Sequence, residues 1–216
     1  MINNWNKVFN KKIDTKLPFP DESLIRFLSQ NLIKKSKRKI KILEIGCGVG
    51  SNLWYLKKKG YSVYGIDSSE RAIFLSKKRC KIEKTKCNIF LMNAKKLQFK
   101  DNYFDIVIDI ECLYSNSLKD TKLILNEVLR VLKKNGNFFS KTFASEMKFL
   151  KKKNKEWYMS SKNIPLFSPH NLLRLTKENQ IKKIYSNFKN LKWEYLHRSV
   201  KNRKYTIKEW LINGKK

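Results

Sequence analysis

Three glycines on alternate residues follow a short apolar run in the segment ILEIGCGVGSNL, residues 42–53. Glycine lets the backbone approach a ligand closely and adopt a positive φ, so such a loop after a buried strand is typical of a cofactor site. The spacing is G-x-G-x-G, and Ser51 stands where a dinucleotide fingerprint has its third glycine. No Gly-Lys-Ser/Thr follows the loop, which excludes a phosphate-cradling P-loop.

Two carboxylates accompany this glycine loop. Glu44 lies two residues before Gly46, and Asp67 lies seventeen residues after Gly50. The Asp67 carboxylate can accept hydrogen bonds from both hydroxyls of a ribose, or it can cap the helix that follows. Because a carboxylate on an apolar strand needs donors, we expect Glu44 to accept the N–H groups of the glycine loop or to face a cationic ligand.

The elements that position these residues alternate between strand and helix. Apolar runs and helical spacing predict strands over 39–46, 61–67, 88–94, 104–110 and 137–144 and helices over 21–35, 51–59, 69–84 and 118–136. The alternation of strand and helix stops after residue 145. Residues 146–167 show no regular pattern, and 168–180 are predicted to form a capped helix. Residues 188–200 and 204–212 are predicted to form two strands joined by a turn at 201–203.

This alternation implies right-handed crossovers and a parallel sheet. We therefore predict a Rossmann-like α/β fold with a seven-stranded, mostly parallel sheet, an antiparallel C-terminal edge, helices on both faces, and a small N-terminal and inserted cap. The expected organisation is one domain over residues 1–216. It comprises an N-terminal helical segment (1–39), a cofactor-binding core (40–145), a cap insertion (146–167) and a C-terminal helix and strand pair (168–216).

The run LEIGCGVGSN followed by GIDSS resembles the class I S-adenosylmethionine-dependent methyltransferase family, and the resemblance is best over residues 40–145. It implies S-adenosyl-L-methionine as the cofactor. Gly46, Cys47 and Gly48, in one loop with Gly50, would then surround the methionine part of the cofactor. Asp67, followed by Ser68, would bind its ribose.

Two further segments resemble motifs of the same family. LMNAKKLQFKDNYFD is similar to its third motif, with Asn93 in place of an acidic residue. The amide oxygen of Asn93 can accept from the adenine amino group, and the Ala94 N–H can donate to the ring. FDIVIDIECLYSN is similar to the fourth motif, whose strand end, here Ile110, lies beside the reactive methyl group.

Methyl transfer from a sulfonium is an in-line displacement, and a hydroxyl or ammonium acceptor must also lose a proton. Glu111, just past the fourth predicted strand, is the candidate base, and Asp109 on that strand is either a further candidate or structural. Glu111 matches a glutamate of ubiquinone-type O-methyltransferases. Those enzymes continue with a Leu-Glu-His pattern that this chain replaces with 113–115, so we expect no metal.

The acceptor pocket is expected to come from parts outside the core. Candidate substrate residues are Tyr114, the aromatic side chains of Trp5 and Trp157, and His170 at a predicted helix start. The alternatives are that the aromatic residues close the core and that His170 only fills a first helical turn. The segments WNKVF, PFPDESLIRFL and NRKYTIKEWLI resemble methyltransferases of bacterial surface-polysaccharide clusters, so we expect a small-molecule or glycan acceptor, methylated on oxygen or nitrogen.

A formal net charge of +31 permits a second interpretation, an RNA (tRNA or rRNA) methyltransferase. The chain has 41 lysines but only 8 arginines, together with 21 asparagines, which A/T-rich codon usage also explains. The fourth motif lacks the Asn/Asp-Pro-Pro-Tyr/Phe pattern of base-amine methylation. A third interpretation is a protein that binds S-adenosylmethionine without catalysis.

The cysteine spacing and the length of the apolar runs indicate in which cellular environment to expect the protein. Four cysteines without C-x-x-C spacing predict free thiols, neither a zinc site nor a disulfide framework. No apolar run approaches the ~20 residues that span a bilayer, and we expect a cytoplasmic protein without a signal peptide. The sequence leaves the oligomeric state open.

Overall fold

The computed structural model describes residues 5–6, 9–10, 19–32, 40–145, 147, 149–159 and 172–216. Its main sheet contains β1 (Lys41–Ile45), β2 (Ser62–Asp67), β3 (Asn88–Leu91), β4 (Phe104–Ile110), β5 (Leu132–Phe143), β9 (Lys189–Val200) and β10 (Tyr205–Lys215). The helices are α2 (Glu22–Leu32), α3 (Ser51–Lys58), α4 (Glu70–Ile82), α5 (Leu118–Val131) and α6 (Glu178–Ile184). None of these helices is long and apolar enough to cross a membrane.

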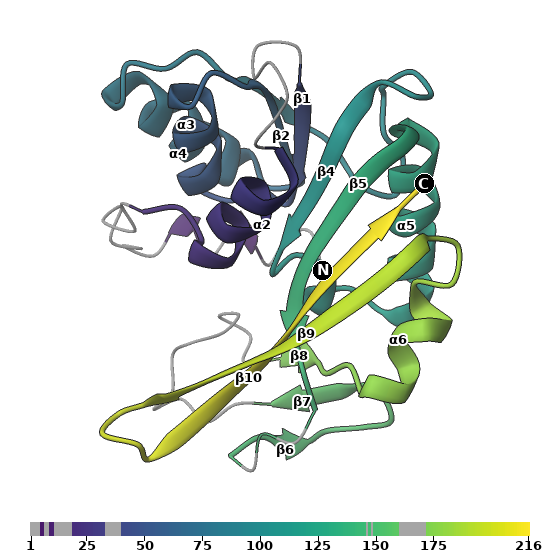
Figure 1. The fold of residues 1–216 in the computed structure, drawn as a ribbon. Helices are drawn as coiled ribbons and strands as arrows, with labels where there is room; N and C mark the ends of the chain where they lie inside the picture. The colour runs from purple at the N-terminus through teal and green to yellow at the C-terminus, as the bar shows by residue number, and fades with distance from the viewer. Residues whose placement is uncertain are drawn as a thin grey trace.

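The seven strands lie in the order β3-β2-β1-β4-β5-β10-β9 (Figure 1). Strands β1 to β5 pair in parallel, and β10 runs antiparallel to both β5 and β9. The β9–β10 turn, residues 201–203, has positive φ at all three positions, which matches the predicted turn. The predicted seven-stranded sheet with an antiparallel C-terminal edge is confirmed.

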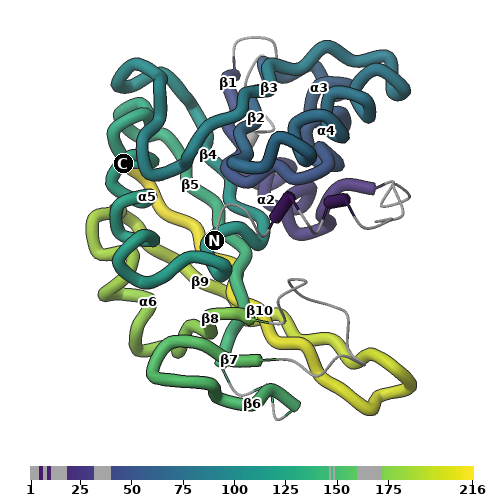
Figure 2. Tube along the Cα trace, turned by 180° about the vertical axis from the view of Figure 1, so that it is seen from behind, coloured from purple at the N-terminus to yellow at the C-terminus, as the bar shows by residue number. Residues whose placement is uncertain are grey.

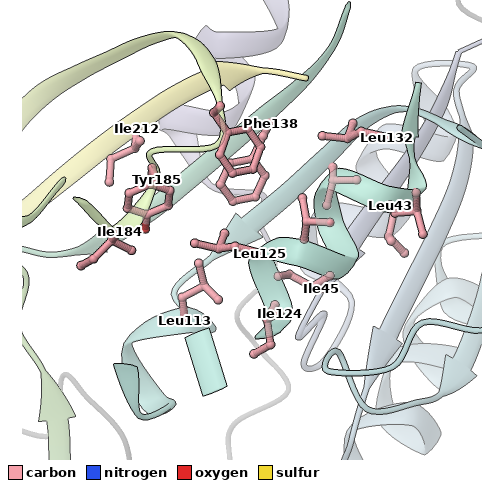
Figure 3. Close-up of a cluster of buried hydrophobic side chains, with 14 of the residues drawn as sticks. Leu43, Ile45, Leu113, Ile124, Leu125, Leu132, Phe138, Ile184, Tyr185 and Ile212 are labelled. Atoms are coloured by element: carbon pink, nitrogen blue, oxygen red, sulfur yellow. The ribbon is translucent and has the colours of Figure 1, made fainter. Parts of the chain in front are cut away.

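Helices cover both faces of this sheet, as the sequence predicts (Figures 1 and 2). Buried residues of α5 and α6 pack against one face, among them Leu125 and Ile184 beside Phe138 of β5 (Figure 3). Buried residues of α2, α3 and α4 pack against the other face, where Phe27 stacks on Phe139 with ring centroids 4.6 Å apart. The side-chain oxygen of Ser69 accepts from the Ala72 N–H, so Ser69 caps α4.

The helix predicted over 118–136 ends earlier, at Val131. Leu132 already has extended backbone, with ψ 138°, and pairs with Phe104 of β4. The turn that follows is held from the far end of the chain, because the Asn135 N–H donates to the Lys216 carbonyl and the Lys216 N–H donates to the Gly136 carbonyl. Pairing with the C-terminal strand therefore overrides the helical tendency of 132–135.

The helix predicted over 168–180 is wrong. Residues 172–174 form a strand, β8 (Leu172–Arg174), and α6 begins only at Glu178. The segment expected to be irregular also contributes strands, β6 (Lys151–Lys152) and β7 (Trp157–Met159). Together they form a three-stranded sheet in the order β6-β7-β8, beside the β9–β10 hairpin (Figures 1 and 2).

Buried polar contacts explain why β8 is a strand. Its Arg174 side chain is buried, and the guanidinium donates to the carbonyls of Leu113 and Asn116 and to the Thr121 hydroxyl. These acceptors belong to α5 and to the segment that leads into it. The backbone at Arg174 also pairs with Trp157 of β7. A helix at this position would not allow that pairing together with these side-chain contacts.

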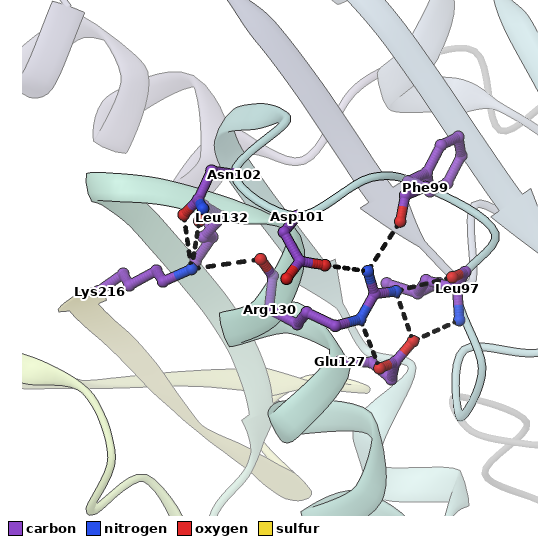
Figure 4. Close-up of polar contacts among 8 residues, drawn as sticks. All are labelled: Leu97, Phe99, Asp101, Asn102, Glu127, Arg130, Leu132 and Lys216. Atoms are coloured by element: carbon purple, nitrogen blue, oxygen red, sulfur yellow. Dashed lines mark hydrogen bonds and ion pairs between the residues drawn. The ribbon is translucent and has the colours of Figure 1, made fainter.

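The loop between β3 and β4 is anchored by Arg130 near the end of α5 (Figure 4). Its guanidinium donates to the carbonyls of Leu97 and Phe99 and to the carboxylates of Asp101 and Glu127, at 2.7–2.9 Å. Glu127 in turn accepts from the Leu97 N–H at 2.7 Å. Three guanidinium bonds to the loop, together with the bond from the Leu97 N–H to Glu127, thus fix the segment that begins at the cavity described below.

We expect Arg130→Lys to lower the free energy of unfolding by about 1–3 kcal/mol, because an ammonium cannot donate in the fork that serves two carbonyls and two carboxylates. Urea unfolding measures the effect. Arg203→Lys, at the exposed turn before β10, is the matched control and should change stability by less than about 0.5 kcal/mol. Equal effects of the two substitutions would contradict the anchoring role of Arg130.

Candidate active site

A cavity of about 470 Å³ opens at the carboxyl ends of β1, β2 and β4. This is the edge at which open parallel sheets bind ligands. The walls come from the glycine loop, the ends of β2 and β4, the loop after β3, the start of α5 and the N-terminal segment. They are formed by Trp5, Phe9, Gly46, Gly48, Ile66, Asp67, Ser68, Met92, Asn93, Ala94, Lys95, Ile110, Glu111, Cys112, Tyr114, Ser115, Asn116, Asp120 and Ile124.

The glycine loop turns sharply at Gly46, where φ is +65°. A Cβ there would lie 2.4 Å from the Cys112 sulfur, so only glycine lets the loop pass so close to the end of β4. Gly48 also has a positive φ, +50°, and a Cβ there would meet only the Phe9 ring at 3.8 Å. Gly46 and Gly48 therefore form a backbone surface at the cavity wall.

Two other residues of the loop face away from the cavity. The Cys47 side chain is buried in the core on the α2–α4 side of the sheet. Gly50 lies against α4, where a Cβ would approach the Ser76 Cβ to 2.9 Å. Gly50 thus allows α3 and α4 to pack closely, a role that the spacing alone did not indicate.

Asp67 ends β2 at the cavity wall and organises the backbone around it. One carboxylate oxygen accepts from the Gly48 N–H at 3.0 Å and the other accepts from the Ser69 N–H at 2.9 Å. Burial raises the pKa of Asp67, and these backbone donors offset part of the rise. Since Ser69 provides the α4 cap, the alternative that Asp67 is that cap is wrong.

Asn93 and Ala94 line the cavity from the loop after β3. The side-chain oxygen of Asn93 accepts from the Lys95 N–H at 3.0 Å, which fixes the turn. An amide oxygen has a second lone pair, so it still has an acceptor position for a ligand. Ile110, at the end of β4, lies in the same wall.

Glu44 lies beneath the loop rather than in the cavity wall. One of its oxygens accepts from the Asn52 side-chain amide at 2.6 Å, and the N–H groups of Cys47, Gly48 and Gly50 donate to other acceptors. The expectation that Glu44 accepts these three N–H groups is therefore wrong. Its other oxygen is buried without a hydrogen-bond partner among the described residues. Burial raises the pKa of Glu44 to about 8.

Glu111 lines the cavity immediately after β4, in left-handed backbone with φ +57°. Its N–H donates to the Lys141 carbonyl at 2.9 Å, and its carboxylate lies 3.4 Å from the Lys141 ammonium. Burial raises its pKa to about 7. Lys141 opposes this rise, and the charges of Glu209 and Asp21 add to it. Glu111 is thus a carboxyl group poised to exchange a proton near neutral pH.

Sequence reasoning missed Lys141 and Glu209. Lys141 lies on β5 and Glu209 on β10, and both side chains are buried. An acidic residue inside the predicted strand KYTIKEWLI was the available signal, since a buried carboxylate demands a partner. Of the two roles left open for Asp109, the structure supports the structural one: it is buried and accepts from the Cys112 and Leu113 N–H groups and the Ser140 hydroxyl.

The structure places Trp5 and Tyr114, but not all four candidate substrate residues, in the cavity wall. Trp5 lies in the wall, paired with Phe9 at 5.9 Å between ring centroids, and Tyr114 lies there against Phe143. Trp157 is on β7 and does not line the cavity. His170 lies outside the described residues.

The cavity wall is acidic although the chain is strongly basic. Its ionisable carboxylates are Asp67, Glu111 and Asp120, against one ammonium, Lys95, which pairs with Asp120 at 3.1 Å. A glycine cradle, a carboxylate at the end of β2 and an acidic wall suit a cofactor that carries a nucleoside and positive charge. No group of three or more His, Cys, Asp or Glu side chains among the described residues could hold a metal ion.

The fold and cavity together define a nucleoside-cofactor-binding α/β protein, and comparisons identify which kind. A family profile described as a methyltransferase domain matches residues 43–140. The chain is 30% identical over 118 residues to an uncharacterized methyltransferase of Schizosaccharomyces pombe, covering 55% of this chain and 81% of that protein. A SAM-dependent methyltransferase structure from Methanosarcina mazei shares the fold, with a TM-score of 0.71, 22% identity, and coverage of 92% of this chain and 98% of that one. The chain belongs to the class I S-adenosylmethionine-dependent methyltransferase family.

Relatives with named acceptors differ from one another. The ubiquinone biosynthesis O-methyltransferase of Pelagibacter ubique is 31% identical over 132 residues, covering 57% of this chain. The tRNA N(3)-methylcytidine methyltransferase of Drosophila melanogaster is 30% identical over 103 residues, covering 44% of this chain. This chain spans about half the length of the first (54%) and a third of the second (32%).

The buried carboxyl of Glu44 predicts a pH effect on stability. Its folded-state pKa of about 8 exceeds the ordinary value of 4.5, so protonation of Glu44 contributes stability that is fully present below pH 4.5 and is lost as the pH rises to about 8. Glu44→Gln keeps the acceptor for Asn52 and cannot ionise. Between pH 5 and pH 8 we expect the free energy of unfolding of the wild type to fall. In the Glu44→Gln variant this fall should be smaller by at least about 1 kcal/mol.

Urea unfolding at several pH values between these limits measures the difference. Glu194→Gln, at an exposed carboxyl of β9, is the control and should follow the wild-type curve. Parallel curves for Glu44→Gln and the wild type would show that Glu44 is ionised throughout this range.

Proposed function

We propose that this chain transfers a methyl group from S-adenosylmethionine to an oxygen or nitrogen of a small-molecule or glycan acceptor, with Glu111 as the general base. The observation that carries the proposal is the position of Glu111. It lies in the wall of the cavity at the end of β4, and its pKa is raised to about 7. A general base works best when its pKa lies near the working pH.

In the proposed arrangement the cofactor lies along the glycine loop. The backbone at Gly46 and Gly48 surrounds its methionine part, and Asp67, beside Ser68, accepts from its ribose hydroxyls. Asn93 and Ala94 contact the adenine, and Ile110 lies beside the methyl group. Cys47 and Gly50 contribute through the shape of the loop, and Glu44 supports it from below through its bond to Asn52, since none of these three lines the cavity.

The reaction requires little chemical activation by the protein. S-adenosylmethionine supplies an already activated methyl group, whose bond to sulfur breaks as the acceptor lone pair attacks. Glu111 takes the proton that an acceptor hydroxyl or ammonium loses. Trp5 and Tyr114 exclude water from the cavity and pack against the acceptor.

The acidic wall favours a neutral or cationic acceptor over a polyanion. Phosphodiester groups would approach Asp67, Glu111 and Asp120, which repel them. The second candidate is an RNA acceptor. It is supported by the net charge of +31 and by the similarity to a tRNA-modifying relative. A basic exterior is compatible with RNA, but the reacting end of the acceptor must still enter an acidic cavity.

Calorimetric titration tests the cofactor assignment. We expect micromolar binding of S-adenosylmethionine and S-adenosylhomocysteine and no binding of NAD. Asp67→Asn should weaken S-adenosylhomocysteine binding by about 10- to 100-fold, because a neutral amide replaces a charged acceptor for the ribose. Asp101→Asn is the control and should bind as the wild type does. Full affinity in Asp67→Asn would remove Asp67 from the ribose site.

Transfer of a radiolabelled methyl group from S-adenosylmethionine tests the acceptor class and the base together. We expect label in a pool of small molecules and glycans but not in total tRNA. Glu111→Gln should reduce transfer by about 100-fold or more with cofactor affinity unchanged, since only the base is lost.

Label in tRNA that survives high salt would favour the RNA candidate instead. Tight cofactor binding with no label in any pool would favour a protein that binds without catalysis. Equal loss of binding and transfer in Glu111→Gln would mark Glu111 as a cofactor-binding or structural residue.

A further inference from the structure

A single buried ammonium, that of Lys141, faces three carboxylates from distant parts of the chain. It lies 2.8 Å from an oxygen of Asp21, which precedes α2, 3.3 Å from one of Glu209 on β10, and 3.4 Å from one of Glu111 after β4. The Lys141 side chain is 8% exposed and that of Glu209 is fully buried. The cluster lies directly behind the part of the cavity wall formed by Glu111.

The charges of this cluster do not balance. Besides Lys141, the nearest cation is Arg198 of β9, whose guanidinium lies 3.8 Å from the second Glu209 oxygen and is half exposed. Neither oxygen of Glu209 has a hydrogen-bond donor among the residues that the structure describes. A buried carboxylate without donors is costly, and the ammonium of Lys141 offsets part of that cost.

Geometry brings the two glutamates together. One oxygen of Glu111 and one of Glu209 approach the same Lys141 nitrogen to within 3.4 Å. The charge of Glu209 therefore acts on Glu111 across the same ammonium and disfavours the ionised form of Glu111. Asp21 is already occupied: it accepts from Lys141 and, through its other oxygen, from the Leu24 N–H.

We propose that Glu209 and Lys141 are positioning residues for Glu111, with Lys141 holding the two glutamates in one cluster and the charge of Glu209 favouring the protonated form of Glu111. This inference rests on the proposed function of Glu111 as general base. It assigns a role in the reaction to the C-terminal strand β10. When Glu111 takes the proton that the acceptor loses, the negative charge of its carboxylate is neutralised next to an ammonium that stays in place.

Other ionisable groups face Glu111 across the cavity and must be considered with the pair. Asp67, Asp120 and Lys95 line the wall, as do the thiol of Cys112 and the phenol of Tyr114. Asp120 and Lys95 neutralise each other, and burial raises the pKa of both Asp67 and Cys112. The raised pKa of Glu111 has burial as its main cause, and the charge of Glu209 adds to it.

The test is a pH titration of the protein labelled with ¹³C at the glutamate side-chain carboxyl, followed by NMR without cofactor or acceptor. The Glu111 resonance is the one missing from Glu111→Gln. In the wild type we expect it to titrate with a midpoint near pH 7. In Glu209→Gln the Glu111 midpoint should fall by about 1–2 pH units, because the neighbouring charge is gone.

Glu194→Gln on the neighbouring strand β9 removes an exposed carboxyl and is the matched control; it should leave the Glu111 midpoint unchanged. Two results would overturn the inference: a wild-type Glu111 midpoint at the ordinary glutamate value, or a raised midpoint that Glu209→Gln leaves in place. If Glu209→Gln does not fold, Glu209→Asp, which draws the carboxylate back from the cluster, should also lower the Glu111 midpoint. An unchanged midpoint in that variant overturns the inference.

This titration and the proposed function fail in different ways. If S-adenosylhomocysteine does not bind, the methyltransferase assignment fails while the effect of Glu209→Gln on the Glu111 titration is unaffected. If the cofactor binds and methyl transfer depends on Glu111, but Glu209→Gln leaves the Glu111 midpoint unchanged, only the inference about Glu209 and Lys141 fails.

Discussion

The bond between Lys141 and Asp21 is the constraint on which much of the site depends. Asp21 donates its own N–H to Asn52, accepts from the first turn of α2, and accepts from Lys141. Asn52 donates in turn to Glu44 beneath the glycine loop. One chain of hydrogen bonds and ion pairs thus runs from β1, below the proposed cofactor position, to β5 and β10 behind the proposed base. Because these groups are buried, removing one leaves the others without partners in a medium of low dielectric.

A second set of contacts shapes the other wall of the cavity. Arg174 of β8 holds the carbonyls of Leu113 and Asn116, and Glu156, in the turn before β7, accepts from the Leu118 N–H at the start of α5. The three-stranded sheet therefore supports the segment that follows Glu111 without contributing side chains to the cavity wall. Elements outside the parallel core fix where an acceptor can lie, while the core fixes where the cofactor can lie. This separation explains how one family keeps its cofactor while its acceptors differ.

The sequence predicted the parallel core closely and the C-terminal third less well. Strand β4 begins and ends at the residues expected, because a fully buried strand in a parallel sheet is a continuous apolar run. The 168–180 segment was misassigned, since its apolar residues fit a helical period in isolation. What decides its structure is the buried guanidinium of Arg174, whose acceptors lie 53–61 residues earlier in the chain. The end of α5 likewise depends on pairing with the last residues of β10, which no local pattern reveals.

By itself, the sequence determined the fold class, the glycine loop and the carboxylates at its edges, because each depends on local residue type and spacing. Which of those residues face the cavity was decided only in three dimensions. Gly46 and Gly48 line it, whereas Gly50 lets two helices pack and Glu44 lies beneath the loop. The surroundings of Glu111 were also decided there. Its proton affinity depends on Lys141 and Glu209, which are 30 and 98 residues away in the sequence and meet it only because β5 and β10 are neighbours in the sheet.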